Sequence, residues 1–227
     1  KSKFIQIKKF MIKKLIKKRN LKFYKLFKTL LDFLFSIFFL IASLPFFIII
    51  SILIKFSSRG PIFFLQERIG KNNISFKCIK FRTMHPEAKD ILENLLMNDK
   101  KLKIEFEQTH KIKNDPRITN IGKLLRKTSL DELPQFINVL KNEMSIVGPR
   151  PIVNKEKKKY GNNFKKVLSV KPGITGLWQV SGRNNLTYKT RIKLDMNYVE
   201  NYNFLMDIRI LIRTIGVILF PLDRGAY

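Results

Sequence analysis

The chain has 227 residues, of which 45% are hydrophobic, and 45 Lys and Arg against 17 Asp and Glu give it a net charge of +28. The hydrophobic content excludes global disorder, and the length allows one domain or one domain with an appendage. The positive charge indicates an anionic partner, which could be lipid headgroups, nucleic acid or a phosphorylated small molecule. A lone Cys78 excludes a disulfide framework among these residues and suits a reducing cytosol, and with His85 and His110 it disfavours zinc.

The run from Phe33 to Ile54 contains no charged residue and is dominated by Phe, Ile and Leu. As a helix with a rise of about 1.5 Å per residue, it could just cross a bilayer core of about 30 Å. A buried core helix of this length without a polar face would be unusual. The run also lacks the short apolar stretch and small-residue cleavage site of a signal peptide. It therefore predicts a membrane-inserted helix.

The charges on both sides of this run bear on its topology. Residues 1–28 contain Lys and Arg but no acid, and Lys55 and Arg59 follow the run. Because basic flanks favour the cytoplasmic face, we expect a re-entrant hairpin that enters and leaves on that face. Pro45 would break the helix, and Ser43 would help to satisfy the freed carbonyl. An ordinary transmembrane helix with a kink at Pro45 is the alternative.

The basic N-terminal stretch places Phe4, Ile7, Met11 and Leu15 at helical spacing. This pattern is typical of a helix that lies on an anionic lipid surface. Nucleic-acid binding would also explain the charge. We do not expect it, because the stretch adjoins the membrane segment and no RNP1-like pattern is present.

The remaining sequence alternates short strands and helices. Periodicity, turn residues and caps predict the following elements in chain order: strands at 62–65 and 75–81, a helix from 85 to about 108, a turn at 114–116, a helix at 121–127, a helix from about Asp131, loops at 147–151 and 171–176, a helix from Thr187 to about 202, and a last helix at 204–220. The apolar stripe of the last helix is expected in the core more often than on a bilayer surface.

Two adjacent acids, Asp131 and Glu132, lie just before Pro134. Proline is tolerated in the first turn of a helix, so we expect the pair at an exposed helix start. Asp131 could be an N-cap, and Glu132 could complete a capping box with Ser129. The pair could equally bind a metal or act as a nucleophile or base. The surrounding cations are expected to keep both acids ionised.

Basic and glycine residues near the pair favour a site for phosphates. Arginine forks match phosphate oxygens, and four arginines lie in or beside segments rich in Gly and Pro: Arg82, Arg126, Arg150 and Arg183. Free backbone N–H groups could add to the site around Gly148, Gly173, Gly176 and Gly182. A carboxylate and Mg²⁺ beside such a pocket would suit phosphoryl transfer. Each arginine alone would be an ordinary surface charge.

Four long motifs occur in order along the chain: Lys80–Met84 (KFRTM), Ser129–Gln135 (SLDELPQ), Ser145–Pro151 (SIVGPRP) and Lys171–Asn184 (KPGITGLWQVSGRN). They closely resemble the bacterial sugar transferases, the monotopic polyprenyl-phosphate phosphoglycosyl transferases. The resemblance covers nearly the whole chain from about Lys22. It implies a membrane helix broken at a Ser-Pro pair, for which this chain has Ser43 and Pro45 separated by Leu44.

The resemblance implies a mechanism in two steps. Asp131 would attack the β-phosphate of a UDP-sugar and release UMP, and polyprenyl phosphate would then take the phosphosugar. Glu132 would act as a base or organise the site, with Mg²⁺ near Asp131. The substrate-binding residues would be Lys80, Arg82, Arg126, Arg183 and the loop Pro149, Arg150 and Pro151.

The segment 178–183 looks most like members that transfer a hexose-1-phosphate, so the UDP-sugar would carry a hexose or an N-acetylated hexose. The expected fold is mixed α/β and mainly helical. Residues 1–59 would form the basic stretch and re-entrant helix, and 60–227 a cytosolic catalytic domain with short strands and interfacial amphipathic helices. The protein would act at the bacterial inner membrane in surface-glycan synthesis, without nucleic acid; a homo-oligomer is left open. The rival hypothesis is a non-catalytic basic membrane adaptor.

Overall fold

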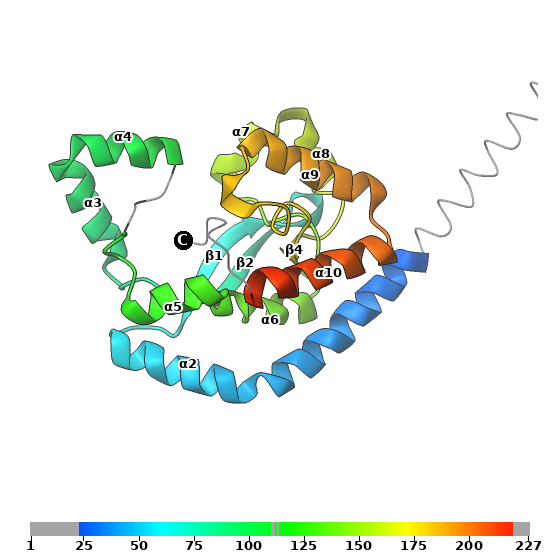
Figure 1. Cartoon of the computed structure of the whole chain (residues 1–227), viewed down its shortest axis with the longest axis horizontal. Helices are drawn as coiled ribbons and strands as arrows, with labels where there is room; N and C mark the ends of the chain where they lie inside the picture. The colour runs from blue at the N-terminus through cyan, green and yellow to red at the C-terminus, as the bar shows by residue number, and fades with distance from the viewer. Residues whose placement is uncertain (1–22, 110–111, 113, 220–227) are drawn as a thin grey trace, which may run out of the picture.

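The computed structural model describes residues 23–109, 112 and 114–219, and its fold is mixed α/β and mostly helical, as predicted (Figure 1). The elements after the first helix (Phe23–Ala42) are α2 (Leu44–Ser57), β1 (Phe63–Ile69), β2 (Ser75–Phe81), α3 (Ala88–Asn98), α4 (Lys100–Thr109), α5 (Asn120–Thr128), α6 (Gln135–Leu140), β3 (Ser145–Val147), α7 (Lys157–Tyr160), α8 (Phe164–Val167), β4 (Gly173–Thr175), α9 (Tyr188–Asn201) and α10 (Phe204–Leu219). Single 3-10 turns lie at Lys71–Asn73, Leu130–Glu132, Asn154–Glu156, Gly161–Asn163 and Arg183–Asn185.

Two small sheets position the loops of the body. Strands β1 and β2 form an antiparallel hairpin whose register runs from Phe63 opposite Phe81 to Ile69 opposite Ser75. The predicted strand 75–81 is confirmed, and the strand predicted at 62–65 extends to Ile69. Strands β3 and β4 pair in parallel and bring the loop after Val147 beside the loop that contains Gly173.

The helix predicted from residue 85 to about 108 is two helices, α3 and α4, so that prediction is wrong in its continuity. Asp99 separates them with an extended backbone. Its carboxylate accepts hydrogen bonds of 2.9 Å from the backbone N–H groups of Lys101 and Leu102. Aspartate competes in this way with a continuing helix and starts a new one instead.

The helix pair at the start of the described chain is bent by 61° at Ser43. Pro45 lies in the first turn of α2, and the Ser43 hydroxyl donates to the Phe39 carbonyl at 2.6 Å. No single described helix is long and apolar enough to cross a membrane, whereas the two helices of this bent pair, taken together, have the length and composition of a membrane segment. The break therefore lies where Ser43 and Pro45 predicted it. The predicted surface helix with Phe4 lies outside the described residues.

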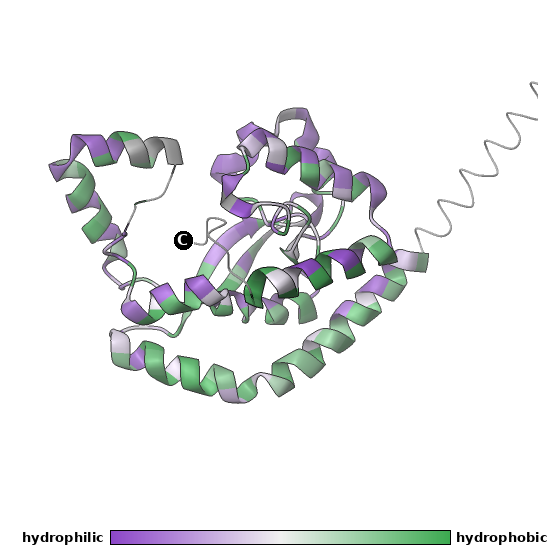
Figure 2. Ribbon diagram, in the orientation of Figure 1, coloured by the Kyte–Doolittle hydropathy of each residue, from purple (hydrophilic) through white to green (hydrophobic). Residues whose placement is uncertain are grey.

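The apolar stripe of the last helix does not face the core, so the core interpretation is wrong. Leu205, Ile212 and Leu219 are exposed, whereas Asp207 and Ile210 are the buried residues of α10. Figure 2 shows hydrophobic residues along α2 and the first helix as well as on α10. The exposed apolar surface is therefore concentrated on these helices.

Two buried aspartates attach the first helix to the body. Asp32 accepts hydrogen bonds from the Ser145 hydroxyl at 2.6 Å and the Ile146 N–H at 3.3 Å. Asp207 of α10 accepts from the Tyr24 hydroxyl and the Lys28 ammonium, both at 2.6 Å. Such contacts between specific polar atoms fix the position of the helix more narrowly than apolar packing alone.

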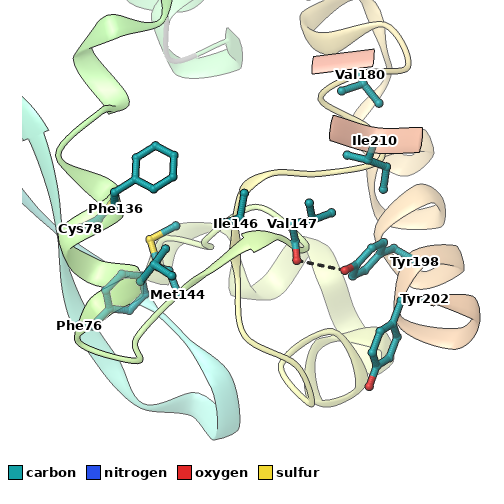
Figure 3. Close-up of a cluster of buried hydrophobic side chains, with 11 residues drawn as sticks. Phe76, Cys78, Phe136, Met144, Ile146, Val147, Val180, Tyr198, Tyr202 and Ile210 are labelled. Atoms are coloured by element: carbon teal, nitrogen blue, oxygen red, sulfur yellow. Dashed lines mark hydrogen bonds between the residues drawn. The ribbon is translucent and has the colours of Figure 1, made fainter. Parts of the chain in front are cut away.

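The main core lies between α6, the hairpin and α9. Figure 3 shows its side chains, with the Tyr198 hydroxyl donating to the Val147 carbonyl at 3.0 Å. Beside this core, Asn138 of α6 is fully buried. Its amide donates to the Lys77 carbonyl at 2.8 Å and accepts from the Ile79 N–H at 3.0 Å. Asn138 therefore joins α6 to the outer backbone of β2.

Replacing this buried amide tests its role in the fold. We expect Asn138→Ala to lower the free energy of unfolding by about 2–4 kcal/mol, because it leaves the Lys77 and Ile79 backbone groups unpaired. Denaturant unfolding in one detergent measures the effect. The control is Asn162→Ala at an exposed position, for which a change within about 0.5 kcal/mol is expected. Equal effects of the two variants would contradict the role of Asn138.

Candidate active site

The acid pair lies in a turn between two helices, not at the start of one. Helix α5 ends at Thr128, and its C-cap residue Ser129 has a left-handed φ of 60°. A 3-10 turn from Leu130 to Glu132 follows. Helix α6 begins only at Gln135, after a buried Pro134. Neither Ser129 nor Pro134 makes a capping side-chain hydrogen bond. The predicted N-cap and capping box are therefore wrong, since the turn directs the two carboxylates elsewhere.

Glu132 forms an ion pair with Lys80 of β2, and the two charged atoms lie 2.6 Å apart. The side chains are only 16% (Lys80) and 23% (Glu132) exposed, so the pair is half-buried rather than at an exposed helix start. Burial alone would raise the pKa of Glu132, but Lys80 and Arg150 hold that pKa well below its usual range. Glu132 is therefore a carboxylate that stays ionised at any physiological pH.

Asp131 has the opposite shift. Burial, and then the negative charge of Glu132, raise the pKa of Asp131 to about 6, against the opposing effects of Lys80 and Arg126. Nearby cations thus dominate the pKa of Glu132 but not that of Asp131, although the expectation that both acids are ionised holds for both at neutral pH. Lys80 already neutralises the neighbouring acid, so its charge stabilises Asp131 less than burial destabilises it. Asp131 is ionised at neutral pH but is more basic than an ordinary aspartate.

A small pocket open to solvent, of about 10 Å³, lies beside this pair. It brings together several predicted site residues, Lys80, Glu132, Arg150 and Pro151. It is far smaller than a typical pocket for a whole ligand, which holds about 300 Å³ or more. Its cations, and not its volume, suit a phosphate group. Burial lowers the pKa of Arg183, and Glu132 opposes this shift, so Arg183 also interacts with the acid of the pocket.

Arg126 lies on the other side of the turn, near Asp131. Burial lowers the pKa of Arg126, and the negative charge of Asp131 opposes that shift. Its Nε donates to the Thr83 hydroxyl at 2.9 Å. Helix α5 approaches Thr83 so closely that a Cβ at Gly122 would lie 2.0 Å from the Thr83 carbonyl oxygen. The segment after β2 thus holds α5, and with it the acid turn, in place.

Arg82 does not join this cluster, which corrects the expectation that it converges on phosphates. Its guanidinium donates to the Ser58 carbonyl at 2.7 Å and the Arg59 carbonyl at 2.9 Å. These carbonyls follow the end of α2, where a helix leaves its last carbonyls without partners. Arg82 therefore links the membrane-helix pair to the hairpin.

The glycines of the two loops serve close packing instead of anion binding. The Gly148 N–H donates to the Thr175 carbonyl at 2.9 Å, and the Gly173 N–H donates to the Pro149 carbonyl at 2.8 Å. A Cβ at Gly173 would lie 2.1 Å from the Gly148 nitrogen. The expectation that free N–H groups bind phosphate here is wrong for Gly148 and Gly173, and for Gly176 and Gly182 it stays a prediction. Pro149 contributes through its carbonyl, which fixes the loop that carries Arg150.

Arg68 is a residue of the pocket that the sequence motifs did not indicate. It is buried, and its guanidinium donates to the Pro151 carbonyl at 2.9 Å and to Gln66 Oε1 at 2.7 Å. Burial, and then Arg150, lower the pKa of Arg68 to about 10. Both hydrogen-bond acceptors are neutral, so an anion in the pocket would be favoured. Arg68 follows Gln66 and Glu67 in β1, so no local pattern distinguished it from a surface charge.

Trp178 is a second missed residue. It is buried, and the guanidinium groups of Arg150 and Arg191 lie 5.9 Å and 4.9 Å from the centre of its ring. Such contacts hold a guanidinium over an aromatic face. Trp178 therefore orients Arg150 toward the pocket, together with the Arg68 contact to the Pro151 carbonyl.

The donor set around the acid pair restricts the metal that it could hold. Among the described residues, no group of three or more His, Cys, Asp or Glu side chains could bind an ion. Glu132 is paired with Lys80, whereas Asp131 is not ion-paired in the described part of the chain. Mg²⁺ commonly takes one or two carboxylates and completes its shell with substrate phosphates and water. In the described part of the chain the pair thus offers one carboxylate without an ion-pair partner, Asp131, which meets this minimum for Mg²⁺.

Comparison with known proteins identifies relatives over most of the chain. A model of the bacterial sugar transferase family matches residues 23–221. The exopolysaccharide production protein ExoY of Sinorhizobium fredii is 44% identical over 200 residues, 88% of each chain. The undecaprenyl-phosphate galactose phosphotransferase of Salmonella typhimurium is 49% identical over 160 residues, 70% of this chain and 34% of that protein. The UDP-glucose:undecaprenyl-phosphate glucose-1-phosphate transferase of Klebsiella pneumoniae is 37% identical over 197 residues, 83% of this chain and 39% of that protein. The chain thus spans little more than a third of the last two.

The opposite pKa shifts of the two acids predict opposite effects on stability. A raised pKa in the folded state means that ionised Asp131 destabilises the fold above about pH 6, and this cost vanishes below the pKa of the unfolded chain. Ionised Glu132, with a lowered pKa, stabilises the fold at neutral pH. We expect Asp131→Asn to raise and Glu132→Gln to lower the Tm at pH 7.5, each by about 2–4 °C. Thermal melting between pH 4 and 8 measures both, and shifts of the same sign would contradict the assignment.

Proposed function

Because the chain belongs to the bacterial sugar transferase family, we propose that it transfers a sugar-1-phosphate from a UDP-sugar to a polyprenyl phosphate. The observation that carries this proposal is the basic pocket lined by Lys80, Glu132 and Arg150, with Asp131 next to Glu132 in the turn beside it. Relatives named for undecaprenyl-phosphate galactose and glucose-1-phosphate transfer support it. Since both names specify hexoses, a UDP-hexose is the expected donor.

In the first step, a carboxylate oxygen of Asp131 attacks the β-phosphorus of the UDP-sugar. The bond from this phosphorus to the oxygen that bridges the two phosphates breaks, and UMP leaves with the bonding electrons. The sugar phosphate stays on Asp131 as an acyl phosphate. The raised pKa of Asp131 supports this role, because a more basic carboxylate that is still ionised at neutral pH is the better nucleophile. Arg126 and Arg150 would hold phosphate oxygens while charge shifts to the leaving group.

In the second step, a phosphate oxygen of the polyprenyl phosphate attacks the same phosphorus and releases Asp131. The products are a polyprenyl diphosphate sugar and the free carboxylate. The lowered pKa of Glu132 makes it a weak base. Of the two roles expected for Glu132, its ion pair therefore supports the organising one: it holds Lys80 in place to bind the incoming phosphate.

A bound Mg²⁺ would supply charge neutralisation at the diphosphate. Asp131 would be its protein ligand before the attack. Of the surrounding cations, Arg68 and Arg150 would bind the donor and orient it toward the carboxylate, and Lys80 would bind the incoming phosphate.

The described helices support action at a membrane surface. We propose that the bent pair of the first helix and α2 is re-entrant, and that the exposed apolar side of α10 lies on the bilayer. The catalytic body would then face the cytoplasm at the bacterial inner membrane, where a soluble nucleotide sugar meets a lipid phosphate. The product would serve surface-glycan synthesis, as the name of the relative ExoY suggests for that protein.

The nucleophile assignment predicts a covalent intermediate. When the purified protein is incubated with UDP-galactose or UDP-glucose and Mg²⁺ but no lipid, intact-mass spectrometry should find one hexose phosphate on the protein and equimolar UMP. Asp131→Asn should form no adduct and lose at least about 10³-fold in transfer. Arg82→Lys is a control, because the Arg82 guanidinium binds carbonyls beyond the end of α2 and not the pocket, so its replacement should leave the adduct intact. Undiminished turnover of Asp131→Asn would exclude this residue as the nucleophile. If the wild type bound lipid in a salt-dependent manner but released no UMP, the result would favour the non-catalytic membrane adaptor.

The re-entrant topology predicts that both ends of the helix pair face the cytoplasm. Single cysteines at Lys3→Cys and Lys158→Cys, the latter exposed on α7, should resist a membrane-impermeant maleimide in spheroplasts. Both should react in inside-out vesicles, whereas the native Cys78 is buried. Labelling of Lys3→Cys alone in spheroplasts would show a spanning helix instead.

A further inference from the structure

Strand β1 begins with three consecutive exposed apolar residues. Phe63, Phe64 and Leu65 are 39%, 51% and 53% exposed. Strand side chains alternate between faces, so this end of the hairpin presents apolar surface on both of them. Phe63 is accounted for, because its ring stacks on the core residue Phe81 with centroids 5.4 Å apart. A run of this kind is unfavourable in water unless another molecule covers it.

Phe64 lies on the face of the hairpin that leads to the active site. The register places it directly opposite Lys80, so their Cβ atoms are about 5 Å apart on one face. Arg68, four residues further along β1, is on the same face and lines the pocket with Lys80. This face therefore runs from an exposed aromatic ring, past a cation, to a buried arginine.

The aromatic end of this face is also the end nearest the membrane helices. Figure 1 shows the chain passing from the end of α2 into β1. Phe56, in the last turn of α2, is 87% exposed. Arg82 ties the two elements together, since its N–H donates to the Ile62 carbonyl at 2.8 Å and its guanidinium binds the Ser58 carbonyl. Exposed aromatic rings thus lie on both sides of this link, Phe56 on α2 and Phe64 beside Lys80.

We infer that Phe64 binds the isoprenoid chain of the lipid acceptor, next to the phosphate that Lys80 holds. An amphiphile with an anionic head and an apolar tail matches the order of groups on this face. The donor then occupies the opposite end, at Arg68 and Arg150. The inference rests on the proposed function. It adds the place of the acceptor and the order in which acceptor and donor lie along the hairpin face. A stacked uracil is the other ligand that an exposed ring could take. Loss of the ring would then raise the KM for the UDP-hexose and not the KM for the acceptor.

Steady-state kinetics in detergent test the subsite. The acceptors are undecaprenyl phosphate and geranyl phosphate, which carries only the first isoprene units. We expect Phe64→Ser to raise the KM for both acceptors about tenfold, and the KM for the UDP-hexose by less than twofold. Phe64→Trp should restore the acceptor KM, because it renews an aromatic surface. The Tm of each variant should match that of the wild type, since the ring is half exposed.

Phe56→Ser is the matched control, because it removes an exposed ring from α2 without approaching the pocket. It should leave the KM for geranyl phosphate unchanged. Equal effects of the two variants would assign Phe64 to bilayer contact and overturn the inference. A rise confined to the KM for the UDP-hexose would assign the ring to the nucleotide and overturn it as well. Absence of UMP release by the wild type would instead refute the proposed function.

Discussion

The ion pair between Lys80 and Glu132 connects the two halves of the site. Lys80 belongs to the hairpin, and Glu132 belongs to the turn that carries Asp131. Both side chains are largely removed from water, so the loss of one would leave an uncompensated charge. The pair thereby holds the turn over the hairpin, and the phosphate pocket lies between them. Asn138 fixes the same hairpin to α6 from the other side of the turn.

This pair also separates the properties of two adjacent acids. The Lys80 ammonium pairs with Glu132 and lowers the pKa of that acid, whereas burial and the charge of Glu132 raise the pKa of Asp131. Neighbouring carboxylates whose environments push their pKa values apart are suited to different tasks. Here the arrangement supports Asp131 as a nucleophile and Glu132 as an organiser. The cost is that ionised Asp131 opposes folding at neutral pH, as strained or poorly solvated groups in active sites commonly do.

Polar contacts also determine where the site lies relative to the apolar helices. Asp32 fastens the first helix to β3, Asp207 fastens it to α10, and Arg82 fastens the end of α2 to the hairpin. The exposed apolar surfaces of α2 and α10 would be buried in a bilayer, but apolar surface alone specifies no orientation. These directional contacts supply it. They place the start of β1, and with it Phe64, between the helix pair and the reacting groups.

Elements with local signals could be predicted from the residues alone. The strand 75–81, the helix capped by Thr187 and the break at Ser43 and Pro45 follow from alternation, capping and the missing proline donor. The motifs also indicated the acid pair and the loop of Arg150. Three features followed from tertiary contacts instead: the link of Arg82 to α2, the entry of Arg68 into the pocket, and the opposite pKa shifts of Asp131 and Glu132. These features depend on desolvation and on partners between 23 and 83 residues away, which no local pattern contains.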